Sequence, residues 1–134
     1  MGAWGVGPFE NDDEADWAYE LEASTGDAAL MDAFEAVLGH DAEVVDLTPA
    51  ANAIGAAEVT ATALGKPAAE LTDGVAAWIA ANREAVTAAT AERALEAVIQ
   101  VARHSELRVL WDEAPDAAAW RASIEALIRR LAAV

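Results

Sequence analysis

Residues 48–67, TPAANAIGAAEVTATALGKP, contain the pattern that decides the fold class. Thr48 followed by Pro49 is a strong start signal, because threonine caps helices and proline suits the first helical position. The run that follows is rich in alanine, the best helix former, and the Gly-Lys-Pro sequence at 65–67 stops a helix. We therefore expect a helix that continues to Leu64 and that neighbouring helices can approach closely.

The composition extends this expectation to the whole chain. Its 134 residues include 37 alanines, and Val, Ile, Leu, Met, Phe, Trp and Tyr together supply another 37 apolar side chains. The alternation of apolar and polar residues that is typical of strands is almost absent. A chain of this length forms one domain with a single core. We expect a compact all-α domain over residues 1–134.

Helical spacing of apolar residues recurs on both sides of the opening stretch. Trp17 and Leu21 are four residues apart, and Trp120, Ile124 and Leu127 continue the same pattern near the C-terminus. The expected helices cover approximately 11–24, 27–38, 48–64, 72–82, 90–103, 105–111 and 116–131, so the bundle has five to seven helices.

Two segments do not fit a helix. Residues 1–10 hold three glycines and a proline, which predicts an irregular Gly-rich N-terminal arm packed on the bundle. Residues 40–47 alone have the character of a short strand.

Negative charge is concentrated in the first half of the chain. Residues 1–73 hold 16 acids and one base, Lys66, whereas residues 74–134 hold 8 acids and 7 arginines, so the formal charge of −16 divides into −15 and −1. A phosphate-binding surface needs clustered Lys and Arg, so we expect no nucleic-acid binding. Adsorption to an anionic membrane is disfavoured for the same reason.

The sequence also bears on location and cofactors. It has no cysteine, which excludes disulfides, thiol nucleophiles and Cys-ligated zinc. It shows neither a membrane-spanning apolar run nor a secretory signal, so we expect a cytoplasmic protein with no cofactor. His40 and His104 share no ligand or catalytic motif.

Three segments carry a resemblance to a known family. The opening MGAWGVGPFEND at 1–12, followed by Trp17, is similar to the start M-G-x-W-G-x-G-x-F-[DE]-[ND]-D of the domain-of-unknown-function 4259 family. Ser105-Glu106-Leu107 with Leu110-Trp111 resembles its S-E-L-x-x-L-W pattern, and Ala56-Ala57-Glu58-Val59 its A-A-E-V stretch. The resemblance implies a compact helical bacterial domain and supplies no reaction.

Four carboxylates are candidates for a metal or hydrolytic site. Asp12 and Asp16 are four residues apart, so on a helix they face the same way and a hard cation could bridge them. Glu58 lies among alanines and Glu106 between polar and apolar neighbours, so partial burial would place them near that pair. The alternative is structural: acids at a helix start interact favourably with the helix dipole, and the two glutamates are either exposed or paired with an arginine such as Arg103 or Arg130.

The five tryptophans also allow two interpretations. Trp17, Trp78 and Trp120 occupy core-like helical positions and supply the bulk that an alanine-rich bundle needs. Trp4 and Trp111 lie near the ends of elements, where an exposed ring serves as an anchor for a partner. The candidate binding residues are Trp4, Asp12, Asp16, Trp17, Glu58, Glu106 and Trp111.

The charge asymmetry favours a function in binding over catalysis. An acidic surface steers a cationic partner and speeds association, which predicts a non-enzymatic module for a basic protein partner, inhibitor- or immunity-like. The alternative is a carboxylate-based metal-binding or hydrolytic site built from Asp12, Asp16, Glu58 and Glu106. The nearly neutral C-terminal half could form a dimer face, so we expect a monomer or a weak homodimer.

Overall fold

The computed structural model describes residues 12–39, 44–66 and 71–134. Of residues 12–15 only the backbone is described. The expected arm at 1–10 with Trp4, and the expected helix start at residue 11, therefore lie outside the described residues.

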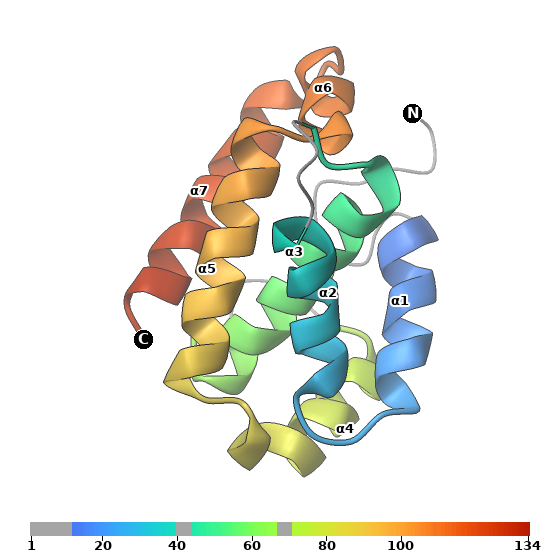
Figure 1. The fold of residues 1–134 in the computed structure, drawn as a ribbon, viewed down its shortest axis with the longest axis vertical. Coiled ribbons are helices and arrows are strands. Elements are labelled where there is room, and N and C mark those ends of the chain that lie inside the picture. The colour runs from blue at the N-terminus through green and yellow to red at the C-terminus, as the bar shows by residue number, and fades with distance from the viewer. Residues whose placement is uncertain (1–11, 40–43, 67–70) are drawn as a thin grey trace.

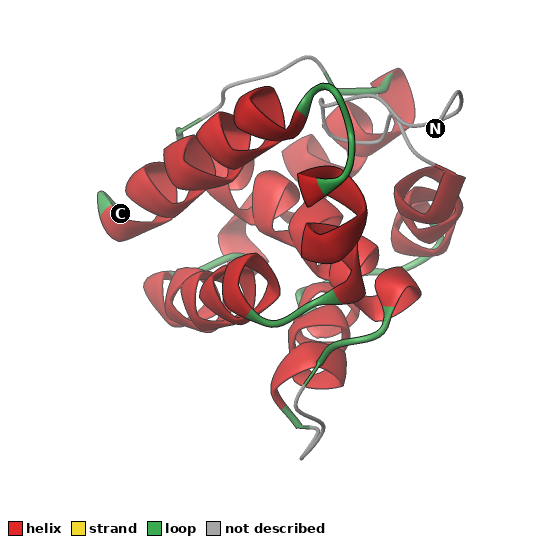
Figure 2. Ribbon diagram, turned by 90° about the horizontal axis from the view of Figure 1, so that it is seen from above, coloured by secondary structure: helices red, strands yellow, loops and turns green. Residues whose placement is uncertain are grey.

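Seven α-helices make up most of the described chain, which confirms the all-α fold. No strand occurs in the described ranges, and Figure 2 accordingly shows helices joined by loops. The helices are α1 (Asp12–Glu22), α2 (Ala28–Leu38), α3 (Leu47–Ala63), α4 (Asp73–Asn82), α5 (Ala88–Arg103), α6 (Glu106–Asp112) and α7 (Ala117–Ala132), with a 3₁₀ turn (Arg83–Ala85) after α4.

Helix α3 is the centre of the molecule. It contacts each of the other six α-helices, and twelve of its 17 residues are buried. Ala50, Ala51, Ala53, Ala56 and Ala57 are fully buried, so the backbones of its neighbours can approach closely. The alanine-rich stretch that predicts the fold class is thus the helix around which the bundle is built.

The remaining helices surround α3 on all sides. In Figure 1, α5 and α7 lie on the left, α1 on the right, α2 in the middle between them, α6 at the top and α4 at the bottom. Helix α5 also packs against α2 and α7, and α1 packs against α4. Leu21, Leu30 and Phe34 are fully buried between these helices, and Trp17, Trp78 and Trp120 are buried as the packing interpretation expects.

Two helix starts agree with the sequence: Thr72 Oγ1 accepts a hydrogen bond from Val75 N, and Ser105 Oγ accepts one from Arg108 N. Helix α5 begins at Ala88, two residues before the expected start, because Thr87 forms a capping box with Thr90. The expected start of the central helix at Thr48 is wrong, because α3 begins at Leu47 with Asp46 as its N-cap residue.

The segment with strand character forms a single β-bridge. Val45 N donates to His104 O at 2.8 Å, and Glu106 N donates to Val45 O at 2.9 Å, in a parallel bridge of Val45 with Ser105. This bridge fastens the start of α3 to the junction of α5 and α6. Residues 40–43 lie outside the described ranges.

The loop between α1 and α2 is fastened to α4. Trp78 Nε1 donates to Ser24 O at 2.9 Å, and Gly26 N donates to Asn82 Oδ1 at 2.9 Å. Gly26 has φ +74°, a conformation that glycine adopts without strain. These bonds hold α1 and α2 in a defined relation to α4, which keeps their outer surfaces in place.

None of the helices described here is both long and apolar enough to cross a membrane.

Candidate functional site: an acidic face with a pocket beside Trp17

Glu58 forms a buried ion pair with Arg130 of α7. Arg130 Nη2 donates to Glu58 Oε1 at 2.9 Å and Nη1 donates to Oε2 at 3.0 Å, with 16% and 9% of the two side chains exposed. Arg130 Nη1 also donates to Lys66 O at 3.1 Å. The pair therefore joins α7 to the middle of α3 and to the turn that follows it, and both Glu58 oxygens are occupied.

Glu106 caps a helix other than its own. Its Oε1 accepts a hydrogen bond from Leu47 N, the first residue of α3, at 3.1 Å. The first N–H groups of a helix have no partner within the helix, and the helix dipole favours a negative charge there. The Glu106 carboxylate therefore supplies the cap that the Asp46 side chain, which makes no cap hydrogen bond, does not.

We expect Glu106→Ala to lower the free energy of unfolding by about 1 kcal/mol, the usual cost of losing a helix cap. Glu106→Gln keeps an oxygen acceptor and should restore about half of that loss or more. Chemical denaturation of both variants measures the difference. Equal stabilities of Glu106→Ala and the unchanged protein would show that the hydrogen bond contributes nothing.

The four carboxylates expected to form one site do not converge where they are described. Glu58 is paired with Arg130, Glu106 caps α3, and Asp16 is exposed on α1. No group of three His, Asp or Glu side chains that could hold a metal ion occurs among the described residues. The Asp12 backbone belongs to α1, and its side chain lies outside the described part. Glu58 and Glu106 therefore each interact with a separate structural partner.

The two described tryptophans among the candidates are both buried. Trp111 is 3% exposed and stacks on Trp120 with 6.3 Å between ring centroids and 6° between ring planes. Trp17 is 6% exposed and lies between α1 and α3, where its remaining surface lines a pocket. Trp111 therefore contributes to packing, and Trp17 contributes to the wall of a cavity.

An acidic surface spans α1, α2 and the start of α3. We call Asp16, Glu20, Asp32 and Asp46 the acidic face: all four are exposed, and none forms an ion pair with a described residue. Helices α1, α2 and α3 contain no lysine or arginine, and they pack against one another. The charges of the acidic face are therefore balanced by no base on their own helices.

Tyr19 adds an aromatic ring to this surface. It is 73% exposed and lies three residues after Asp16, so the two side chains are neighbours on α1. Aromatic faces attract cations, and tyrosine is common in protein interfaces. The exposed side of α1 thus carries both an acid pair and an aromatic ring.

A pocket of about 290 Å³ opens between α1, α2 and the start of α3. Trp17 and Glu20 of α1, Asp32 of α2, and Thr48 and Asn52 of α3 line it, together with three alanines of α2. The small alanine side chains leave space beside the indole that a leucine would fill. The pocket therefore belongs to the acidic face and carries two of its four carboxylates.

Glu35, three residues after Asp32 on α2, is an acid that is neutralised. Arg93 Nε of α5 donates to Glu35 Oε1 at 2.6 Å, and Arg93 Nη1 donates to Glu96 Oε2 at 2.6 Å. The hydrogen bond from Arg93 holds the pKa of Glu35 below its ordinary value of 4.5. Glu35 therefore does not belong to the acidic face, although it lies on the same helix as Asp32.

We expect the Glu35 carboxyl to titrate below 4.5, followed by carbon-detected NMR, and to return to that ordinary value in Arg93→Met. A carboxyl whose pKa is lowered by folding stabilises the protein above its ordinary pKa, and this contribution is lost as the pH falls through the lowered value. Since the pair is exposed, salt should weaken the shift. A midpoint at or above 4.5 in the unchanged protein would contradict the pairing.

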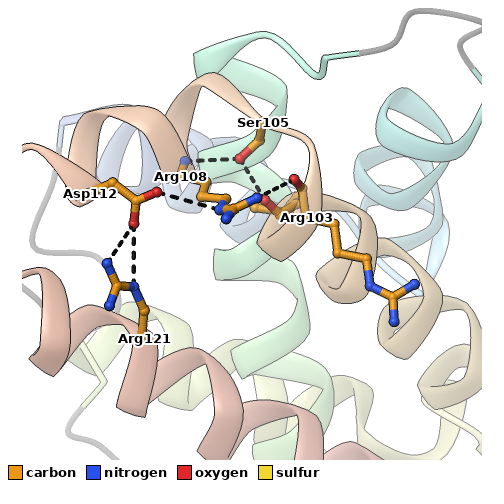
Figure 3. Close-up of polar contacts among 6 residues, drawn as sticks. Arg103, Ser105, Arg108, Asp112 and Arg121 are labelled. Atoms are coloured by element: carbon orange, nitrogen blue, oxygen red, sulfur yellow. Dashed lines mark hydrogen bonds and ion pairs between the residues drawn. The ribbon is translucent and has the colours of Figure 1, made fainter.

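Three arginines lie close together in the nearly neutral C-terminal half of the chain, at the end of α5 and on α6 and α7. Asp112 of α6 accepts from Arg121 Nη2 at 3.0 Å and pairs with Arg108 Nε at 3.5 Å, while Arg108 Nη1 donates to Arg103 O at 2.7 Å. Figure 3 shows Arg108 and Arg121 turned toward Asp112, whereas the Arg103 guanidinium extends away. Two arginines therefore share one carboxylate in this cluster.

Sequence patterns did not single out Tyr19, Glu20, Asp32 or Asn52. Tyr19 could have been found, because it lies two residues from both Trp17 and Leu21 and thus off the buried stripe of α1. The pocket could not, since it depends on how three helices meet.

Fold and surface together define a class: an all-helical domain whose N-terminal helices present an acidic, aromatic-bearing surface. The chain belongs to the family described as "Domain of unknown function (DUF4259)", which it matches over residues 2–123. This match confirms the resemblance to the family. No curated protein and no solved structure matches the chain.

Proposed function

We propose that this protein is a non-enzymatic binding module whose acidic face docks a basic protein surface, in the manner of an inhibitor or immunity protein. One observation carries the proposal: α1, α2 and α3 hold no lysine or arginine, and the acidic face that they form has no ion-pair partner in the described chain. The expected cytoplasmic location stays a prediction.

Physical arguments favour a partner over simple solvation of these acids. Several acids elsewhere in the described chain take arginine partners, as Glu35, Glu58 and Asp112 do, whereas no acid of the acidic face does. Unbalanced like charges on adjoining helices repel one another, and a cationic partner relieves this repulsion. Tyr19 offers such a partner a large, rigid contact at little entropic cost.

The metal or hydrolytic alternative has less support. Its described members, Asp16, Glu58 and Glu106, lie in three separate surroundings, and the two glutamates already have partners. We therefore do not propose it as a second function.

Capture from a native lysate tests the proposal when charge variants are compared. Asp16→Asn/Asp46→Asn removes two charges of the acidic face, keeps a residue that caps helices at 46, and leaves the pocket lining unchanged. Glu84→Gln/Glu113→Gln removes two exposed charges elsewhere and is the matched control. We expect a basic protein to be captured by the unchanged and control proteins and to bind the face variant about three-fold less tightly per charge removed.

Salt provides the second arm of the experiment. Raising the salt from about 0.01 M to about 0.1 M shortens the Debye length from about 30 Å to about 10 Å, which should release the partner. Equal capture by all three proteins, capture insensitive to salt, or no captured basic protein would each overturn the proposal.

A further inference from the structure

Two opposite charges lie at the centre of the exposed side of α7. Helix α7 packs against α3, α5 and α6, and its outer side carries Glu125 and Arg129, which are both exposed and one helical turn apart. Neither forms an ion pair with a described residue, and they do not pair with each other. The outer side of α7 therefore offers one unpaired charge of each sign, in a fixed order along the helix.

The order of these charges selects the partner that fits them. A uniformly acidic surface would be attracted by Arg129 and repelled by Glu125, and a uniformly basic surface would meet the opposite result. A partner that satisfies both groups must present the same two charges in reverse order. A second copy of α7, running antiparallel across a two-fold axis, does so, because each Glu125 then faces the Arg129 of the other copy.

The side chains around this pair permit close contact with another helix. Of the seven exposed residues of α7, four are alanines, at positions 118, 119, 122 and 132, and the distance between packed helices depends on the side chains at the contact. A pocket of about 180 Å³ between α5, α6 and α7 opens beside Glu125 and is lined by Trp120, Ile124 and the partly buried Ile128. Burial of this apolar edge favours association, whereas an exposed ion pair contributes little and mainly fixes the register.

The distribution of charge over the molecule favours contact between two copies on this side. Residues 74–134 have a formal charge of −1, whereas residues 1–73 have −15. Helices α7 and α1 lie on opposite sides of the molecule in Figure 1. Two copies that meet through α7 therefore keep their acidic N-terminal helices far apart, where repulsion between them is weakest and is screened by salt.

From these features we infer that two copies of the chain form a weak homodimer through antiparallel packing of α7, with Glu125 of each copy against Arg129 of the other. The inference goes beyond the proposed function and does not depend on it, because the dimer leaves both acidic faces exposed. Contact through one helix pair buries little area, so we expect a Kd of about 0.1 mM. At micromolar concentrations the chain is then a monomer.

Charge reversal tests the inference, with sedimentation equilibrium of the full chain up to about 1 mM as the measurement. Glu125→Arg and Arg129→Glu each place like charges in both contacts, so each should weaken the dimer by about ten-fold. The double variant Glu125→Arg/Arg129→Glu restores opposite charges and should return the Kd to within about two-fold of the unchanged protein. Circular dichroism of each variant verifies the fold.

A general effect of net charge predicts a different pattern. Glu125→Arg makes the chain less negative and Arg129→Glu makes it more negative, so net charge alone would strengthen association in the first variant and weaken it in the second. Glu84→Arg, in the exposed turn after α4, changes the net charge as Glu125→Arg does and should not weaken the dimer. Opposite effects of the two single variants, a double variant as weak as either, or a monomer up to about 1 mM would each overturn the inference.

A spin label tests the antiparallel orientation. The chain has no cysteine, so Ala133→Cys, at the exposed end of α7, carries a single nitroxide. In a concentrated mixture of spin-labelled and ¹⁵N-labelled copies, the antiparallel pair places the nitroxide near Arg121 and Ala122 of the other copy, and we expect their amide signals to broaden. Broadening confined to the C-terminal end of α7 would contradict the antiparallel arrangement, and the absence of broadening between copies would contradict the contact itself.

Discussion

Replacing Glu58 by glutamine is expected to lower the free energy of unfolding by about 3 kcal/mol, the largest effect of any charge removal in the described chain. Glu58 and Arg130 are mostly buried, and the guanidinium meets both carboxylate oxygens. Glutamine fills the same space and leaves the arginine charged and without a counterion. Arg130 Nε already has no hydrogen-bond partner among the described residues, which offer no alternative acceptor at that atom.

The double variant Glu58→Leu/Arg130→Met should recover most of this loss, because apolar residues of similar volume require no desolvated charge. Urea denaturation of the single and double variants gives both free energies of unfolding, provided that the m-value, the slope of free energy against urea concentration, stays the same. The control is Glu125→Gln, an exposed glutamate on α7 expected to change stability by less than about 0.5 kcal/mol. If Glu58→Gln costs no more than this control, the pair does not stabilise the fold.

Trp111→Ala is expected to cost about 3 to 5 kcal/mol, because removing a buried indole leaves a large cavity. Trp111 is 3% exposed and joins α6 to α7 through its stacking on Trp120, so the change should also loosen α6. The change tests packing against the anchor interpretation, in which an exposed ring would be lost with little effect on stability.

A double-mutant cycle isolates the contact between the two rings. Trp111→Leu, Trp120→Leu and the double variant should give a coupling of about 0.5 to 1.5 kcal/mol, the usual value for an aromatic pair. Tyr19→Ala is the matched aromatic control and should be nearly neutral, since Tyr19 is 73% exposed. A small loss in Trp111→Ala together with weaker partner binding would favour the anchor role instead.

The local part of the fold could be predicted from the sequence because local signals determine it. Ser105 lies at a cap position before a short apolar stretch, and the structure has it accept from Arg108 N and begin α6. Thr72 begins α4 for the same reason. Trp120, Ile124 and Leu127 share one helix face, and all three are buried.

The features that the sequence does not predict correctly arise from contacts between distant segments of the chain. Glu106 meets Leu47 across 59 positions, and no spacing rule relates a carboxylate to the start of another helix. Thr48 was expected to begin the central helix because Pro49 follows it, yet the chain enters the helix earlier, where the bridge of Val45 with Ser105 holds it. Tertiary contacts outweighed the local signal in both cases.

The candidate site shows the same division. The sequence shows that negative charge is concentrated in residues 1–73, and this predicts a site in the acidic half of the chain. Which acids remain unpaired is not visible there: Glu35 and Asp32 lie on one helix, yet only Glu35 meets Arg93. The pocket depends on α2 presenting Ala29, Ala33 and Ala36 toward Trp17, and this requires the packing of α1, α2 and α3.

The association rate constant of the captured basic partner, measured against salt for the unchanged protein and for Asp16→Asn/Asp46→Asn, tests the central claim most directly. Electrostatic steering acts mainly on association, so we predict a rate that falls steeply with salt and a slower rate with a shallower salt dependence in the variant. The Glu84→Gln/Glu113→Gln control should follow the unchanged protein. An association rate that is independent of salt, or equal in the face variant and the control, would contradict an acidic face that docks a basic surface.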